Sequence, residues 1–116
     1  MENWEFALVD LAMEIIISDE KVSQTELSYF DSLLYKFNAN EKCRKDSIDK
    51  LLNIKKWDEI HSLAKKSKRI LLKQDERTRI NVIKELVYIA ESDGLDPREE
   101  IIINDLMDLL INNFPE

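Results

Sequence analysis

The chain has very little glycine, proline, cysteine and histidine: one Gly, two Pro, one Cys and one His among 116 residues. Sheet-rich domains need many glycine-containing turns, so this scarcity favours helices joined by short turns. A lone cysteine, Cys43, excludes an internal disulfide and fits a reducing compartment. Apolar runs such as residues 15–17 are far too short for a signal-peptide core or a membrane span. We therefore expect a soluble, cytoplasmic, all-α protein.

The motifs of common enzyme classes are also missing. The sequence contains no phosphate-binding glycine loop, no metalloprotease histidine pair and no histidine–cysteine ligand cluster. His61 is followed directly by Ser62, which is too close for a catalytic pair, and we interpret the two as surface residues. Cys43 has the spacing of an apolar helix position, and we interpret it as a small core residue. The prediction is a protein that is not an enzyme and has no catalytic residues.

At this length the chain predicts one domain, over residues 1–116, with a core that needs no metal or disulfide. Apolar residues at three- and four-residue spacings, together with capping residues, predict a compact bundle of about six helices. The expected helices cover residues 4–17, 23–37, 41–52, 57–73, 76–92 and 97–114. Ser23, Asn40, Asp75 and Asp96 are the expected caps at the starts of four of them. Among the expected core residues are Phe6, Leu8, Val9, Leu11, Ala12, Ile15 and Ile16 in the first helix, and Cys43, Ile48, Leu51 and Leu52 in the third.

What the chain does contain is one short pattern twice, about seventy residues apart. Residues 12–27 and 86–100 both read as an apolar helix, Ser-Asp, a tight turn, one apolar residue, a capping residue, and a Glu three positions later. The offset is 74 up to the Ser-Asp pair and 73 beyond the turn, so the second turn is one residue shorter. Two units are too few for a solenoid, so the pattern predicts one closed domain with an internal pseudo-two-fold repeat. Its two copies cover about residues 4–37 and 76–113.

The charge is divided along the chain. The net charge is −7, but residues 1–36 and 86–116 carry −6 and −7, while residues 41–85 carry +6. Two interpretations stay open. In the first, oppositely charged helices pack as neighbours and their charges lie on solvated faces. In the second, a dipolar surface steers a charged partner or a cation toward the acidic pole.

The acidic turns have two interpretations as well. Asp19 and Asp93 follow helix C-termini, where backbone carbonyls lack partners and the helix dipole is negative. Each is a structural turn residue, or it combines with those carbonyls in an oxygen-rich site for Ca²⁺ or Mg²⁺. Glu26 and Glu99 likewise complete capping boxes with Ser23 and Asp96, or they serve as ligands that converge with the turn carboxylates.

Basic residues recur on one side of the expected fourth helix. Lys65, Arg69 and Lys73 have four-residue spacing, and Lys66 and Lys68 lie beside them. The rest of the chain is acidic and supplies no row of stacking aromatics, so we expect no nucleic-acid partner. The remaining interpretations are a solvated face and a face that docks a protein.

At its repeated turns the chain resembles the tellurite-resistance TerB-like family, which includes N-terminal domains of DnaJ-like membrane co-chaperones. The resemblance depends on residues 89–99 and on the degenerate copy at residues 15–26. It implies an all-α domain with internal pseudo-symmetry, an acidic cation site, and links to stress responses, metal-related resistance and membrane-associated or phage-defence complexes. The chain departs from the family pattern at Glu20, which replaces a glycine and predicts a reshaped first turn. The shorter second turn leaves open whether Glu99 or Glu100 is the motif glutamate.

Two functional hypotheses follow. The first is a non-enzymatic module in a stress response or scaffold that binds a divalent cation, either Ca²⁺ or Mg²⁺. The second is an acidic interaction or immunity-type factor that docks a basic protein partner without metal. The metal ligands expected under the first hypothesis are Asp19, Glu26, Asp93 and Glu99.

Overall fold

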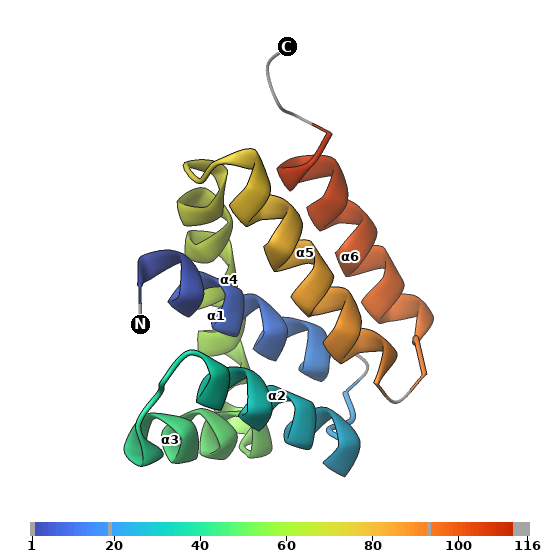
Figure 1. Ribbon diagram of the computed structural model, residues 1–116. Helices are drawn as coiled ribbons and strands as arrows, with labels where there is room; N and C mark the ends of the chain where they lie inside the picture. Colours follow the sequence, from blue (N-terminus) through green and yellow to red (C-terminus); the bar gives the residue numbers. More distant parts are fainter. Residues whose placement is uncertain (1, 19, 93, 113–116) are drawn as a thin grey trace.

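The computed structural model describes residues 2–18, 20–92 and 94–112, and these residues form helices and turns without a strand. Figure 1 shows the helices packed into one bundle. The predicted all-α bundle of about six helices is confirmed. Their bounds are α1 Asn3–Ile17, α2 Gln24–Lys36, α3 Glu41–Leu52, α4 Trp57–Leu72, α5 Glu76–Glu91 and α6 Pro97–Leu110, with a 3₁₀ turn, η1 Ile54–Lys56, before α4.

The helix starts lie where the local chemistry places them. Ser23 Oγ accepts the Glu26 N–H at 3.0 Å, and Asn40 Oδ1 accepts the Cys43 N–H at 2.8 Å. Asp75 and Asp96 cap α5 and α6 in the same way, which confirms all four predicted caps. The turn η1 is absent from the predicted elements. Asn53 caps it, and its side chain accepts the Lys55 N–H at 3.1 Å.

Helix α1 is the central element of the bundle. It contacts each of the other five α-helices and packs most extensively against α4. In Figure 1, α1 crosses α4, and α5 lies beside it. Its sequence contains only four polar residues, so several of its faces can be covered at once. The buried residues of α1 are Ala7, Leu8, Val9, Leu11, Ala12, Met13, Ile15, Ile16 and Ile17.

Two expected core residues lie at the surface instead. Phe6 is 47% exposed, although Ala7 and Leu8 beside it are fully buried. Helix α1 is apolar on nearly every side, so periodicity alone could not show which side its first turn leaves uncovered. Leu52 is 59% exposed because Leu51 takes the inward position, and adjacent helical residues point about 100° apart. The prediction was wrong at both positions.

Half-buried aromatic residues close the edges of the core. Trp57 Nε1 donates to the Leu51 carbonyl at 3.0 Å, which joins the start of α4 to α3. Trp4 packs edge-to-face on Phe37, with ring centroids 5.8 Å apart.

Among the described helices, none combines the length and the apolar character needed to cross a membrane.

Candidate functional site

The first acidic turn joins α1 to α2. Ser18 ends α1, and its Oγ donates to the Ile15 carbonyl at 2.6 Å, which satisfies one of the free carbonyls of the helix end. Two residues later, Glu20 has a φ of +63° and donates its N–H to the Ile17 carbonyl at 3.0 Å. Among the described residues of this turn, Glu20 is the left-handed one, and Ser23 then caps α2.

The second acidic turn, between α5 and α6, has the same construction. Ser92 Oγ donates to the Ile89 carbonyl at 2.7 Å, and Gly94, with a φ of +83°, donates its N–H to the Glu91 carbonyl at 3.2 Å. Ser92 and Gly94 are therefore the counterparts of Ser18 and Glu20. The missing residue falls after the left-handed position, where Gly94 is separated from the Asp96 cap by one residue only.

The predicted reshaping of the first turn by Glu20 was wrong. Glu20 takes up the left-handed conformation that glycine adopts readily, as Gly94 does in the second turn, so the backbone at this position is not reshaped. The hydrogen bonds of Ser18 and Glu20 to the end of α1 hold the chain in that form. The glycine-to-glutamate difference is therefore accommodated as local backbone strain.

Glu26 and Glu99 occupy equivalent places behind these turns. Glu26 is 3% exposed and Glu99 is 2% exposed. Glu26 Oε1 accepts the Ser23 N–H, and Glu99 Oε1 accepts the Asp96 N–H, each at 3.3 Å. Both predicted capping boxes are confirmed. Glu100 is exposed, so Glu99 is the counterpart of Glu26.

The other two predicted ligands, Asp19 and Asp93, lie outside the described residues. Within the described ranges, no three His, Cys, Asp or Glu side chains are grouped closely enough to hold a metal ion. Helices α1 and α5, which lead into the two turns, pack against each other. Figure 1 shows both helices ending on the same side of the bundle, so the turns emerge near one another in that view.

A hollow adjoins the first turn. It has a volume of about 420 Å³ and lies between Ile17 and Glu20 on one side and Ile54, Trp57 and His61 on the other. No sequence pattern predicted that α4 lies beside this turn. The single histidine of the chain thus lies next to an acidic turn, in a place that no local motif indicated.

Polar residues of α1 continue from this hollow along α4. His61 Nδ1 lies 3.4 Å from Glu14 Oε2, and Ser67 donates to Asp10 Oδ2 at 3.1 Å. Burial raises the pKa of the Asp10 carboxyl, while the Ser67 hydroxyl and the charge of Lys50 oppose the change. His61 therefore contacts a carboxylate of α1.

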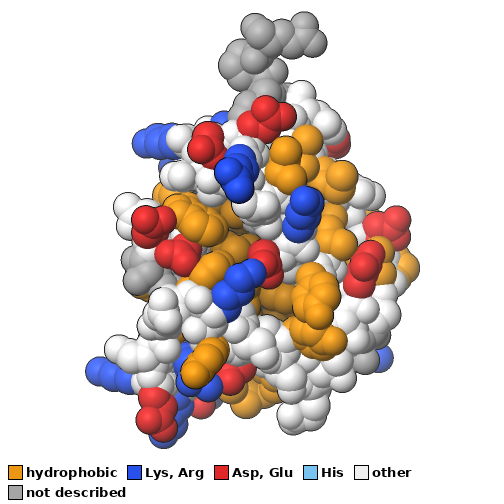
Figure 2. Space-filling model, in the orientation of Figure 1, with side chains coloured by type: hydrophobic (Ala, Val, Ile, Leu, Met, Phe, Trp, Pro, Cys, Tyr) orange, Lys and Arg blue, Asp and Glu red, His pale blue; other side chains and the backbone are white. Residues whose placement is uncertain are grey.

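The remaining candidates lie at the surface or near it. Cys43, expected in the core, is half-buried in the first turn of α3. Lys65 and Arg69 are exposed on α4, and Lys73 is exposed directly after its end. Figure 2 shows acidic side chains over α6, where the exposed residues include Glu100, Asp105 and Asp108.

Comparison with known families gives one result that covers nearly the whole chain. The model of the family described as "Tellurite resistance protein TerB" matches residues 5–112, from the first turn of α1 to the residues that follow α6. Neither a curated protein nor a solved structure matches the chain significantly.

Proposed function

The chain belongs to the tellurite resistance TerB family, and we propose from this that it is a non-enzymatic binding module whose two acidic turns bind a divalent cation. The cation is Ca²⁺ or Mg²⁺, and the module acts in a stress response or as a scaffold. Its ligands come from Asp19 and Glu26 at one turn and from Asp93 and Glu99 at the other.

One observation carries this proposal: a buried glutamate recurs behind each of two turns that share a serine hydrogen bond to the helix end and a left-handed residue. Buried carboxylates are rare in proteins because water is lost from the charge. Each capping hydrogen bond uses the Oε1 atom of Glu26 or Glu99. Hard cations prefer carboxylate and carbonyl oxygens, and the sequence of each turn combines Asp and Glu with the carbonyls of a helix end.

The capping role and the ligand role can be separated by changing glutamate to glutamine. The side-chain carbonyl of glutamine still accepts the cap N–H, so Glu26→Gln/Glu99→Gln keeps the capping boxes while it removes two charges. We expect millimolar Ca²⁺ or Mg²⁺ to raise the Tm of the wild type by about 5 °C or more. The same ion should leave the Tm of the Glu26→Gln/Glu99→Gln and Asp19→Asn/Asp93→Asn variants unchanged.

Glu100→Gln provides the matched control, because it removes one exposed charge from the same helix turn. Its Tm should rise with the ion as the wild type does. If the wild type shows no rise, or if the double variants respond like the wild type, the cation proposal fails.

A second function is favoured by the outer face of α6. Exposed Asp105 and Asp108 lie there beside Ile101, which is 61% exposed, and Met107, which is 38% exposed. An acidic surface with apolar residues among the charges suits a basic, amphipathic protein partner. Under this alternative, binding of an amphipathic Lys/Leu peptide should slow steeply as salt rises from about 50 to 500 mM and should ignore chelator. An association rate that is insensitive to salt, or unchanged by Asp105→Lys, would exclude it.

A further inference from the structure

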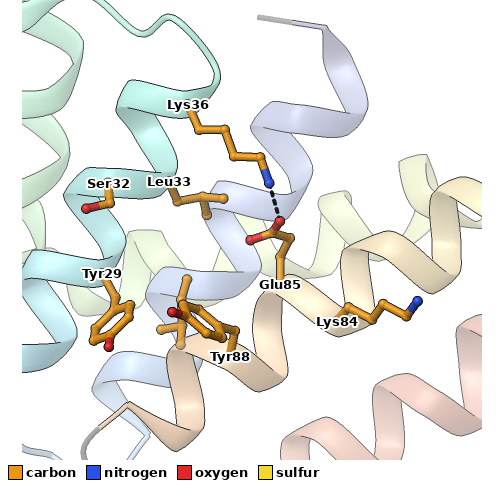
Figure 3. Close-up of a pocket in the computed structure, with 8 residues that line it drawn as sticks. Tyr29, Ser32, Leu33, Lys36, Lys84, Glu85 and Tyr88 are labelled. Carbon is orange, nitrogen blue, oxygen red and sulfur yellow. Dashed lines mark hydrogen bonds and ion pairs between the residues drawn. The ribbon is translucent and has the colours of Figure 1, made fainter.

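A groove without any residue of the acidic turns runs between α2 and α5. Its volume is about 430 Å³. Figure 3 shows its two walls, with Tyr29, Ser32 and Leu33 on α2 and Glu85 and Tyr88 on α5. No sequence pattern predicted this surface, because α2 and α5 belong to different copies of the repeat.

The apolar part of the groove is a pair of tyrosines. Tyr29 and Tyr88 meet edge-to-face, with ring centroids 5.1 Å apart, and Tyr88 is 60% exposed. Leu33 and Ile89 are buried beneath them. Two amphipathic rings above an aliphatic floor form a surface on which a proline or leucine side chain can pack.

A second hollow continues the groove toward the start of α1. It has a volume of about 370 Å³ and is lined by Trp4, Leu8 and Phe37. Both hollows share Lys36, Lys84 and Glu85, so these charged residues lie between two aromatic subsites. Figure 2 shows apolar side chains on this face with basic and acidic groups among them.

The charged residues between the subsites favour an anion. Lys36 Nζ pairs with Glu85 Oε1 across the groove, as the dashed line in Figure 3 marks. Lys84 lines both hollows, with its side chain directed away from the Lys36–Glu85 pair in Figure 3, and forms no ion pair within the described ranges. This part of the groove therefore has one positive charge in excess, on a chain whose net charge is −7. A local cation of this kind selects an acidic group.

We propose that this groove binds a short acidic, proline-containing segment of a partner protein in the polyproline II conformation. Aromatic-lined grooves recognise such segments because the extended helix is already ordered before binding. Asn81 and Tyr88 mark the two subsites on α5 and are about 10 Å apart along its axis, which three residues of polyproline II span. Two apolar side chains fill the subsites, and a carboxylate between them pairs with Lys84.

The test uses the complete chain and the peptide acetyl-Pro-Leu-Glu-Pro-Leu-Pro-amide, with Gln in place of Glu in the control peptide. In NMR titrations the Glu peptide should shift the amide signals of Tyr29, Lys84 and Tyr88 with a Kd of about 1 mM or lower. The Gln peptide should bind at least about fivefold more weakly. Chelator should have no effect, which distinguishes this site from the proposed cation site.

Variants then test the two parts of the groove. Lys84→Glu should weaken binding of the Glu peptide about tenfold or more and should favour a peptide with Lys at that position. Tyr88→Ala, at a largely exposed residue, should abolish the shifts while the fold is retained. Lys66→Glu, an exposed charge reversal on α4, is the matched control and should bind normally. Shifts elsewhere on the molecule, equal affinity for both peptides, or unchanged binding by Lys84→Glu would each overturn the proposal.

Discussion

At the scale of single residues, Glu20 carries backbone strain that its counterpart Gly94 avoids. A left-handed conformation costs an L residue about 1–2 kcal/mol, and Glu20 has a φ of +63°. We expect Glu20→Gly to raise the free energy of unfolding by about 0.5–1 kcal/mol, after allowance for the greater freedom of glycine in the unfolded chain. Urea denaturation measures this change.

Two further variants check the cause of that gain. Glu20→Ala keeps the Cβ atom and the strain, so it should give no comparable stabilisation. Gly94→Ala should lower stability by about 1 kcal/mol through conformation alone, because a Cβ at this position would meet nothing within 4 Å. A Gly94→Ala variant as stable as the wild type would contradict this account. So would a rise in the free energy of unfolding from Glu20→Ala as large as that from Glu20→Gly.

Asp10 makes stability depend on pH through its burial. The folded state raises the pKa of Asp10 above 3.8, so it holds the proton more tightly than the unfolded chain does. The stability that the folded protein gains from this tighter proton binding is fully present below pH 3.8. It is lost as the pH rises through the pKa of Asp10 in the folded state. Asp10→Asn keeps an acceptor for Ser67 and should be more stable than the wild type at pH 7. That advantage should shrink as the pH falls toward 3.8.

Asp31 provides a control of opposite sign. Hydrogen bonds from Arg44 Nε at 3.0 Å and Nη2 at 2.9 Å lower the pKa of the Asp31 carboxyl below 3.8. Its contribution is therefore present above pH 3.8 and is lost as the pH falls through the folded pKa. In thermal melts across pH, Asp31→Asn should destabilise most near neutral pH, while Asp10→Asn stabilises there. Two variants with the same pH trend would refute the assignment.

At the scale of the helices, Arg79 joins the ends of two of them. Arg79 is 8% exposed, and its guanidinium donates to the carbonyls of Leu72, at the end of α4, and Leu110, at the end of α6. Nε donates to the Gln74 carbonyl at 3.1 Å. A cation at a helix C-terminus also interacts favourably with the helix dipole. Arg79 therefore stabilises the packing of α4, α5 and α6 together.

Replacing Arg79 should lower the free energy of unfolding more than replacing any surface residue. We expect Arg79→Met to lower the free energy of unfolding by about 2–3 kcal/mol, because buried carbonyls lose their donors. Arg79→Lys should retain only part of this stability, since one ammonium group cannot reproduce the planar arrangement of N–H donors in a guanidinium. Arg77→Met, on the exposed side of the same helix, should stay within about 0.5 kcal/mol of the wild type in chemical denaturation. Equal effects at both arginines would exclude the capping role of Arg79.

The helix ends show what sequence patterns capture at this scale. Ser23, Asp75 and Asp96 were predicted as caps because each bonds an N–H within three residues, so the necessary information is local. The misplacement of Phe6 and Leu52 has a different origin. Which side of a helix is covered depends on neighbours that are distant in the chain.

At the scale of the whole molecule, the two copies of the repeat have unequal positions. Helix α1 contacts all five other α-helices and buries residues on several sides, whereas α3 buries Leu51 alone. The stability of the bundle should therefore be distributed unevenly, with α1 exposed to solvent only on global unfolding.

Native-state hydrogen exchange measures this distribution. For the amides of α1, the free energy of the opening that permits exchange should equal that of global unfolding. This free energy should fall with denaturant concentration with the m-value of global unfolding. Those of α3 should exchange through a local opening that costs less and depends little on denaturant. Protection of α3 equal to that of α1 would show that the six helices unfold as one unit.

The sequence by itself determined the helical class, four of the helix starts and the places of the two turns, and it offered capping as one of two roles for Glu26 and Glu99. All of these depend on hydrogen bonds and backbone preferences within a few residues. Only the tertiary structure decided that the first copy supplies the central helix, that His61 lies beside the first turn, and that Tyr29 meets Tyr88. Those contacts join segments tens of residues apart, and they result from burying as much apolar surface as possible over the whole chain, which no local pattern encodes.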